Sequence, residues 1–249
     1  MTRILLSGAN GRMGHVIENC SHNFENTKIV SGVDLNNKEY ALFPIHKSIT
    51  ECREKADVII DFSHPSCLND LLTYAISNNL PLVAATTGYN EDQIALIKQA
   101  SNKIPVFFTF NMSLGVNLLI DLAKKATAVL GDQFDIEIIE KHHNQKIDAP
   151  SGTAIMLANA INQTAQERYQ YEFDRHSKRQ KRQKNEIGIH AVRGGTIVGE
   201  HEVIFAGRDE IVTLTHQAMS KDIFAVGALK AAQFLKDQKP GLYSMSDLL

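Results

Sequence analysis

The chain has 249 residues, of which 43% are hydrophobic and 22% are charged, and its formal net charge is -2 at pH 7. This composition is typical of a globular protein of one large or two modest domains, and it gives no overall attraction to nucleic acid or to acidic membranes. Three cysteines without CxxC spacing, and no apolar run long enough for a membrane span or a signal peptide, predict a cytoplasmic protein with reduced thiols.

The first part of the chain, up to about residue 110, alternates short β-branched runs with helical patterns. This alternation is typical of a parallel sheet connected by crossover helices, so we expect an α/β fold. The expected strands are Ile4–Ser7, Ile29–Asp34, Val58–Phe62, Leu82–Thr86 and Val106–Phe110. Between the first two strands, apolar residues from Met13 to Cys20 recur at helical spacing and predict a helix that packs on the sheet.

The second part of the chain has a different pattern and predicts an α+β domain. We expect a helix over Leu114–Leu130, a strand over Phe134–Lys141 and a helix over Ser151–Arg168. Three strands that we expect to be antiparallel follow at Ile187–Val192, Glu202–Ala206 and Ile211–Gln217. A last helix is expected over Ile223–Leu235, and the pattern does not say on which domain it packs.

The turn after the first strand contains Gly8, Gly11 and Gly14, spaced GxxGxxG. Glycine allows a tight turn, close approach of the backbone to a pyrophosphate, and close packing of the following helix. A glycine triplet alone would equally fit a plain turn, but Asp34 follows Gly14 by 20 residues at the end of the second strand. A carboxylate there can accept hydrogen bonds from the adenosine ribose, so the combination predicts a Rossmann-like dinucleotide-binding domain.

Two further strand ends, at residues 62–65 and 86–88, should open on the same edge of the sheet. Ligands bind at the carboxyl ends of the strands in open parallel sheets, so both turns are candidates for cofactor contact. Ordinary turn chemistry explains them equally well, and the residues alone leave the choice open.

The densest chemistry lies in residues 140–153, which contain His142, His143, Lys146 and the helix start Ser151–Thr153. Imidazole titrates near neutral pH, so the histidines could donate a proton or bind an anion. Lys146 could hold a carboxylate or donate a proton, and the helix start offers amides and hydroxyls to an anion. This set suits a dicarboxylate substrate.

Structural interpretations of the same residues also exist. Ser151 could be only a helix N-cap, and Pro150 fits a loop or a helix start. Adjacent histidines on one strand point to opposite faces and no cysteine lies near them in the sequence, so we predict no metal site. The basic segment 175–184 lacks interleaved aromatic residues and predicts a solvated loop rather than a nucleic-acid partner.

The string His142–Thr153 closely resembles the signature of the 4-hydroxy-tetrahydrodipicolinate reductase family. Further segments with the same resemblance are Gly8–Gly14, Ala85–Gly88, Asn111–Asn117, Ile187–His201 and Gly241–Tyr243. The resemblance therefore extends over nearly the whole chain. It departs from the family at Ser63-His64, where Thr-Arg is frequent, so it implies no arginine contact to a cofactor phosphate at that turn.

The resemblance implies reduction of 4-hydroxy-tetrahydrodipicolinate to tetrahydrodipicolinate with loss of water, by NADH or NADPH, in lysine and diaminopimelate biosynthesis. It implies a dinucleotide-binding domain of residues 1–113 plus 223–249, and a second domain of residues 114–222 that binds the dicarboxylate substrate and builds a homotetramer. By this resemblance His142 donates the proton and Lys146 is its cationic partner. The residues expected to bind substrate carboxylates are His143, Gly152 and Thr153. Those expected to bind cofactor are Gly8, Gly11, Arg12, Met13, Gly14, Asp34, Phe62, Thr86, Gly88 and Phe110.

Asp34 affects the choice between NADH and NADPH. A carboxylate at the ribose position accepts hydrogen bonds from both hydroxyls of NADH and repels a 2′-phosphate. No arginine occurs at residues 35–37, whereas Lys38 or Arg12 could reach the phosphate. We therefore expect use of both cofactors with a modest preference for NADH.

Two other functions remain open at this point. Another two-domain nicotinamide enzyme, an amino-acid or imine dehydrogenase, would share the glycine loop and Asp34 but need not combine His142 with Lys146. A non-enzymatic dinucleotide sensor or nucleic-acid-binding module would use the basic segment 175–184.

Overall fold

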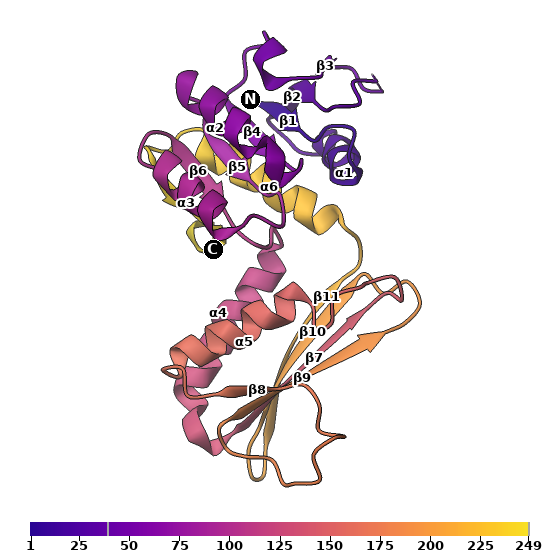
Figure 1. The fold of residues 1–249 in the computed structure, drawn as a ribbon, viewed down its shortest axis with the longest axis vertical. Helices are drawn as coiled ribbons and strands as arrows, with labels where there is room; N and C mark the ends of the chain where they lie inside the picture. Colours follow the sequence, from indigo (N-terminus) through magenta and orange to yellow (C-terminus); the bar gives the residue numbers. More distant parts are fainter. Residues whose placement is uncertain (39, 249) are drawn as a thin grey trace. The chain divides into compact units, whose positions relative to one another are not determined.

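The computed structural model describes residues 1–38 and 40–248. The chain forms two compact units, the first made of Met1–Leu114 with Lys221–Leu249 and the second of Gly115–Ser220. Each unit has its own β-sheet (Figure 1).

The sheet of the first unit has seven parallel strands in the order β12-β6-β5-β4-β1-β2-β3. Their bounds are β1 Thr2–Ser7, β2 Thr27–Val33, β3 Ile45–His46, β4 Val58–Asp61, β5 Leu82–Ala84, β6 Pro105–Phe108 and β12 Gly241–Tyr243. The five predicted strands are confirmed with ends shifted by one or two residues. The sequence did not predict β3 and β12, because strands of two or three residues produce no recognisable alternation.

Helices cover both faces of this sheet. Their bounds are α1 Arg12–Ser21, α2 Leu68–Ser77, α3 Glu91–Ala100 and α6 Asp222–Leu235. In β1, Ile4 and Leu6 pack with α1 and α6, whereas Leu5 packs with α2 and α3. Successive strand residues point to opposite faces, so one strand joins two apolar layers. The apolar pattern did not assign the last helix, and the family resemblance placed it in the dinucleotide-binding domain. In the structure it belongs to the first unit.

The sheet of the second unit has five strands in the order β11-β10-β7-β9-β8, with two helices on one side of it (Figure 1). The bounds are α4 Leu114–Leu130, β7 Asp135–His142, α5 Gly152–Thr164, β8 Gln170–Glu172, β9 Glu186–Arg193, β10 Gly199–Ala206 and β11 Ile211–Ala218. Inward residues of the strands, such as Ile138 and Phe205, pack with Leu119 of α4 and Leu157 of α5. Short 3-10 helices lie at Ile49–Glu51, Pro65–Cys67, Gly131–Gln133 and Met245–Asp247.

Two details of the second unit differ from the sequence prediction. The strand β9 pairs in parallel with β7 and β8, so the expectation of three antiparallel strands is wrong for it. The connection from β7 to β9 runs through α5, which is long enough for a crossover between parallel strands. The helix α5 ends at Thr164 rather than Arg168, because Gln166 and Glu167 take left-handed backbone conformations with φ of +59° and +58°.

No helix in the described part of the chain has both the length and the apolar character that a membrane crossing requires.

Candidate functional site

The glycine loop of the first unit connects β1 to α1. At Gly8 the backbone has φ of +82°, and a Cβ atom would lie 2.5 Å from the carbonyl oxygen of Phe62. At Gly14, a Cβ atom would lie 2.3 Å from the carbonyl oxygens of both Gly8 and Ala9. The first glycine is required by the turn and the second by close packing of the helix, which are two of the roles that a dinucleotide-binding loop assigns to glycine.

Asp34 follows β2 and is tied to this loop. Its two carboxylate oxygens accept the backbone amides of Asn10, at 2.9 Å, and Asn36, at 3.0 Å. Each carboxylate oxygen has two lone pairs, so both keep the capacity to accept a hydroxyl of a ribose. The loop and the carboxylate therefore fit a nicotinamide dinucleotide, with Asp34 suited to the ribose hydroxyls of NADH.

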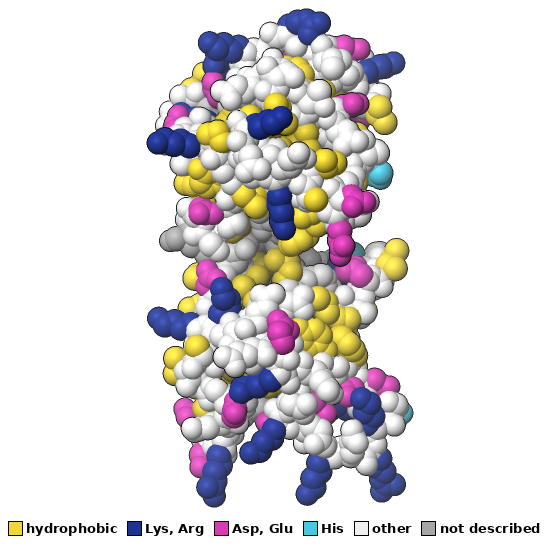
Figure 2. Space-filling view, turned by 60° about the vertical axis from the view of Figure 1, so that its left-hand side comes forward, with side chains coloured by type: hydrophobic (Ala, Val, Ile, Leu, Met, Phe, Trp, Pro, Cys, Tyr) yellow, Lys and Arg dark blue, Asp and Glu magenta, His cyan; other side chains and the backbone are white. Residues whose placement is uncertain are grey.

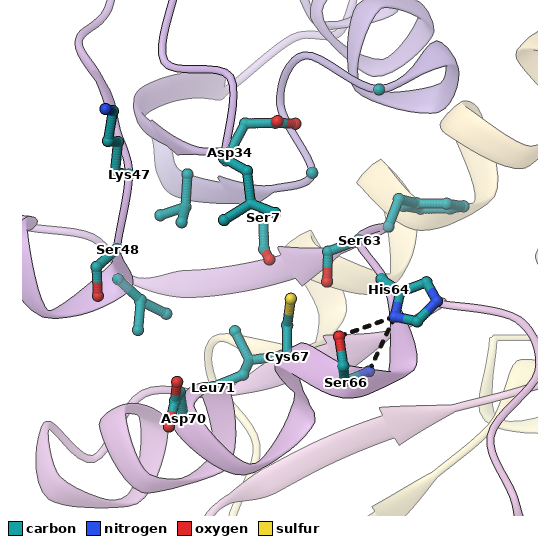
Figure 3. Close-up of a pocket in the computed structure, with 16 residues that line it drawn as sticks. Ser7, Asp34, Lys47, Ser48, Ser63, His64, Ser66, Cys67, Asp70 and Leu71 are labelled. Carbon is teal, nitrogen blue, oxygen red and sulfur yellow. Dashed lines mark hydrogen bonds between the residues drawn. The ribbon is translucent and has the colours of Figure 1, made fainter.

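A cavity of about 330 Å³ lies between these elements and the ends of β3 and β4 (Figure 3). Four predicted cofactor residues line it: Gly8, Gly11, Asp34 and Phe62. The remaining lining residues are Ser7, Val33, Leu35, Lys47, Ser48, Ile49, Ser63, His64, Ser66, Cys67, Asp70 and Leu71. Three other predicted cofactor residues begin α1 without lining the cavity: Arg12, Met13 and Gly14.

The last three predicted cofactor residues lie after β5 and β6, outside this cavity. The hydroxyl of Thr86 donates to Asp61 at 2.7 Å, Gly88 has φ of +86°, and Phe110 is 64% exposed. Asp61, at the end of β4, also accepts from the Ser63 hydroxyl at 2.6 Å and from other donors in the same turns. It holds the ends of β4 and β5 together, a role that the sequence analysis missed although an aspartate that ends an apolar strand is a recognisable signal.

The centre of the second unit is a carboxylate with no exposed surface, Glu140 of β7. The guanidinium of Arg193, at the end of β9, donates to both of its oxygens at 2.7 Å. His142 donates through Nδ1 at 2.6 Å, and the backbone amide of Ser151 donates at 2.9 Å. Glu140 therefore connects two strands of the sheet to the start of α5.

These contacts set the protonation states. Burial alone would raise the pKa of Glu140, but hydrogen bonds from Arg193, His142 and the Ser151 amide more than offset it and lower that pKa. Burial also lowers the pKa of His142, and the Glu140 contact offsets this only in part. An ionised Glu140 can only accept, so the neutral ring of His142 carries its proton on Nδ1. Nε2 is then the nitrogen that can exchange a proton with a substrate.

The ring of His142 is packed closely on the neighbouring strand. A Cβ atom at Gly199, the first residue of β10, would lie 3.1 Å from Nε2 of His142. On the same strand, His201 is 4% exposed, and its ring centroid lies 5.2 Å from that of His142. Burial lowers the pKa of His201 to about 3, so this second imidazole is neutral.

The predicted substrate residues lie between β7 and the first turn of α5. His143 follows β7, and the ammonium of Lys146 lies 2.9 Å from a carboxylate oxygen of Asp148. Gly152 and Thr153 are the first residues of α5. The structure thus brings the expected proton donor, cation and helix start into one connection of the chain.

Ser151 holds that helix start in place. Its hydroxyl oxygen caps α5 by accepting the amide of Ala154, as the structural interpretation of this residue expected. The same hydroxyl lies 2.9 Å from Nε2 of His201. A neutral imidazole has one acceptor nitrogen, so the Ser151 hydroxyl can donate its proton to Nε2 of His201. The start of α5 is therefore attached to β10 through this hydroxyl and to Glu140 through the Ser151 amide.

Sequence reasoning missed Glu140, Arg193 and His201 as parts of this site. A signal existed for Glu140, because residues two apart on a strand share a face and His142 was already a candidate. The positions of Arg193 and His201 depend on which strands pair, and the sequence does not contain that information directly.

The basic segment 175–184 is engaged within its own unit. Arg175 bonds Glu137 and Glu186 at 2.9 Å, and Arg182 bonds Glu137 at 3.0 Å. On the face shown in Figure 2, Lys and Arg side chains are separated by uncharged surface and interspersed with Asp and Glu. The ion pairs of Arg175 and Arg182 favour the interpretation of this segment as a loop rather than a nucleic-acid site.

Comparison with known proteins adds to this geometry. The family model for the N-terminus of dihydrodipicolinate reductase matches residues 2–112, and the model for its C-terminus matches residues 115–249. Relatives named 4-hydroxy-tetrahydrodipicolinate reductase, from Clostridium novyi (strain NT) and from Caldanaerobacter subterraneus subsp. tengcongensis, are each 50% identical to this chain. Each alignment covers 100% of the chain and 98% of the relative.

Solved structures are similar over the whole chain. A dipicolinate-bound dihydrodipicolinate reductase from Paenisporosarcina sp. TG-14 has a TM-score of 0.84 and 26% identity, with 100% of both chains covered. An aspartate dehydrogenase from Thermotoga maritima has a TM-score of 0.53 and 10% identity, with coverage of 96% of this chain and 98% of the other. The second likeness concerns the fold alone.

We predict that Glu140→Gln lowers the free energy of unfolding by roughly 3 kcal/mol, because it leaves the guanidinium of Arg193 without its buried counter-charge. The matched control is Glu137→Gln, on the same strand, whose carboxylate also binds two arginines but is partly exposed. There we expect a loss of about 1 kcal/mol or less. Urea denaturation followed by circular dichroism compares the variants, and equal losses would contradict the special role of Glu140.

Proposed function

This chain belongs to the dihydrodipicolinate reductase family, and we propose that Glu140, His142 and Arg193 form the proton-transfer centre of its activity. The protein is an NAD(P)H-dependent oxidoreductase that reduces 4-hydroxy-tetrahydrodipicolinate, an activity of amino-acid biosynthesis. The observation that carries the proposal is the short hydrogen bond between Nδ1 of His142 and the buried Glu140, which leaves Nε2 for the substrate.

The reduction consumes one proton together with one hydride. When bound, the reduced nicotinamide supplies the hydride. His142 donates the proton to the substrate through Nε2. Glu140 keeps the ring in one orientation and stabilises its charged form. Arg193 in turn keeps Glu140 ionised. Arg193 therefore acts through Glu140 and is a positioning residue.

Substrate binding helps His142 to gain its proton. In the free protein the pKa of His142 is lowered by burial, and the nearby charge of Lys146 lowers it further. A dicarboxylate brings negative charge close to the ring and to Lys146, which raises that pKa again. The proton donor is therefore charged mainly when substrate is present.

The start of α5 and its surroundings are proposed to bind the substrate carboxylates. Gly152 and Thr153 lie in the first turn, where backbone amides and the helix dipole favour an anion. His143 and Lys146 add a polar ring and a cation from the connection before the helix. A relative whose solved structure contains dipicolinate, itself a dicarboxylate, supports a dicarboxylate as the ligand.

The cofactor-binding role is proposed for the first unit and the substrate-binding role for the second. The proposed cofactor-binding domain comprises residues 1–113 plus 223–249, and the proposed substrate-binding domain comprises residues 114–222. The glycine loop, Asp34 and their cavity support the first role, and the His142 cluster supports the second. A homotetramer built by the second sheet is proposed from the family resemblance, and the exposed Ile211 and Val192 on its strands support it. Cytoplasmic location likewise stays a proposal.

The two alternative functions are less well supported. The likeness to an aspartate dehydrogenase lies at 10% identity, whereas named reductases reach 50%. A nucleic-acid-binding module would need the cations of segment 175–184, of which Arg175 and Arg182 are bound to carboxylates of the same unit.

We predict that His142→Gln and Lys146→Ala each lower turnover strongly while leaving the affinity for NADH almost unchanged. Loss of general acid catalysis is worth about 10² to 10⁴ in rate. Turnover is measured as loss of NADH or NADPH absorbance with enzymatically generated 4-hydroxy-tetrahydrodipicolinate. A matched control is His190→Gln, whose imidazole bonds Glu137 instead. Near-parental turnover in both test variants would refute the assignment of the proton-transfer centre.

We predict that Thr153→Val raises the Michaelis constant for the substrate by about tenfold, the order expected for loss of a hydrogen bond to a charged group. The affinity for NADH should not change, because Thr153 lies in the second unit. The same absorbance assay and a fluorescence titration of NADH separate the two effects. A loss confined to NADH binding would place Thr153 in the cofactor site instead.

A further inference from the structure

The cavity beside Asp34 contains one strongly basic side chain that the sequence analysis did not consider. Among the described residues that line this cavity, Lys47 is the only lysine or arginine. Arg12 and Lys38, the two cations that the sequence suggested for a 2′-phosphate, do not line it. Both Lys47 and Lys38 are exposed, so they differ in position rather than in burial.

The pairing of two strands places Lys47 next to Asp34. In the parallel pair β2 and β3, Val33 lies opposite His46, and the amide of Asp34 donates to the carbonyl oxygen of His46 at 3.0 Å. Asp34 and Lys47 are the residues that directly follow this pair. Their side chains therefore leave the same edge of the sheet from neighbouring strands (Figure 3).

The segment that carries Lys47 is held in position at several points. The backbone amide of Lys47 donates to the carboxylate of Glu51 at 3.2 Å, and the side chain of Ile49 is buried. Before it, Nε2 of His46 lies 3.1 Å from a carboxylate oxygen of Glu54. These two side chains and the thiol of Cys52 also form a group of potential metal ligands, with all three atoms within 4.8 Å of one another.

The ammonium of Lys47 is available to a ligand. The salt bridges formed by residues 1–38 and 40–248 do not include it. The neighbouring Ser48 also lines the cavity, and its hydroxyl oxygen caps the 3-10 helix Ile49–Glu51 by accepting the backbone amide of Thr50 (Figure 3). Lys47 thus places a cation on the edge of the sheet that carries Asp34, and Ser48 adds a polar side chain to the lining of the same cavity.

We propose that Lys47, assisted by Ser48, binds the 2′-phosphate of NADPH and so gives this protein its use of both nicotinamide cofactors. The inference rests on the proposed cofactor site, in which Asp34 marks the ribose of the adenosine half. A carboxylate at that position repels a 2′-phosphate, and a lysine on the adjacent strand supplies the opposite charge. NADH needs only Asp34, whereas NADPH needs Lys47 as well.

Direct binding measurements test this inference without relying on catalysis. Dissociation constants for NADH and NADPH are measured by fluorescence titration at fixed, moderate salt for the parental protein, Lys47→Ala, Lys47→Arg and the matched control Lys38→Ala. For Lys47→Ala we expect NADPH to bind about tenfold more weakly, with a change of less than about twofold for NADH. Lys47→Arg keeps the charge and should retain NADPH binding, and Lys38→Ala should leave both constants unchanged.

A mononucleotide pair isolates the phosphate contact. In competition with NADH, 2′,5′-ADP should lose affinity in Lys47→Ala while 5′-AMP should not. The parental affinity for 2′,5′-ADP should also fall more steeply with salt than that of Lys47→Ala, because screening weakens a contact between charges. Equal weakening of NADH and NADPH in Lys47→Ala, or a selective loss of NADPH in Lys38→Ala instead, would overturn the assignment.

A further variant separates this inference from the proposed cofactor site. Asp34→Asn removes the repelling charge and should shift the ratio of the two dissociation constants towards NADPH. If Asp34→Asn changes neither constant, the cofactor site itself is misplaced. If Asp34→Asn shifts the ratio but Lys47→Ala does not, the cofactor site stands and the role of Lys47 is refuted.

Discussion

The arrangement of the second unit depends on one constraint, which is that a fully buried carboxylate must have its charge and its lone pairs satisfied. Glu140 meets this requirement with a guanidinium from β9, an imidazole from its own strand and the amide that begins α5. Removing Arg193 would leave an unpaired charge in the protein interior, and removing either of the other donors would leave a lone pair of Glu140 without its hydrogen bond. The same contacts that stabilise Glu140 therefore hold three elements in the geometry on which the proposed proton transfer depends.

The first unit meets a comparable constraint through the backbone. The turn at Gly8 and the contact at Gly14 leave no room for a side chain, so β1 and α1 approach closely enough for the loop to be tied to Asp34. A second carboxylate, Asp61, collects hydroxyls from the turns after β4 and β5. In both units, an acidic side chain at or near the end of a strand connects the segments to which ligand binding is assigned in our proposal.

The sequence predicted much of this, and its failures have physical reasons. Long periodic segments such as Leu114–Leu130 were predicted with correct bounds, because the helical spacing of their apolar residues indicates a helix with one buried face. The parallel pairing of β9 and the position of Arg193 were not predicted, since they depend on contacts between distant segments. Lys47 was missed because the strand before it, β3, has only two residues and gives no pattern of its own.

The central claim is that burial keeps His142 neutral in the free protein and that Glu140 holds the ring proton on Nδ1, which leaves Nε2 for the proposed proton transfer. Nitrogen-15 NMR of histidine-labelled protein, with His142 assigned by comparison with His142→Gln, tests this directly. The account predicts a protonated Nδ1, an unprotonated Nε2 and a pKa below the ordinary 6.5 for this ring. A ring protonated on Nε2 at neutral pH, or a pKa above 6.5, would contradict it.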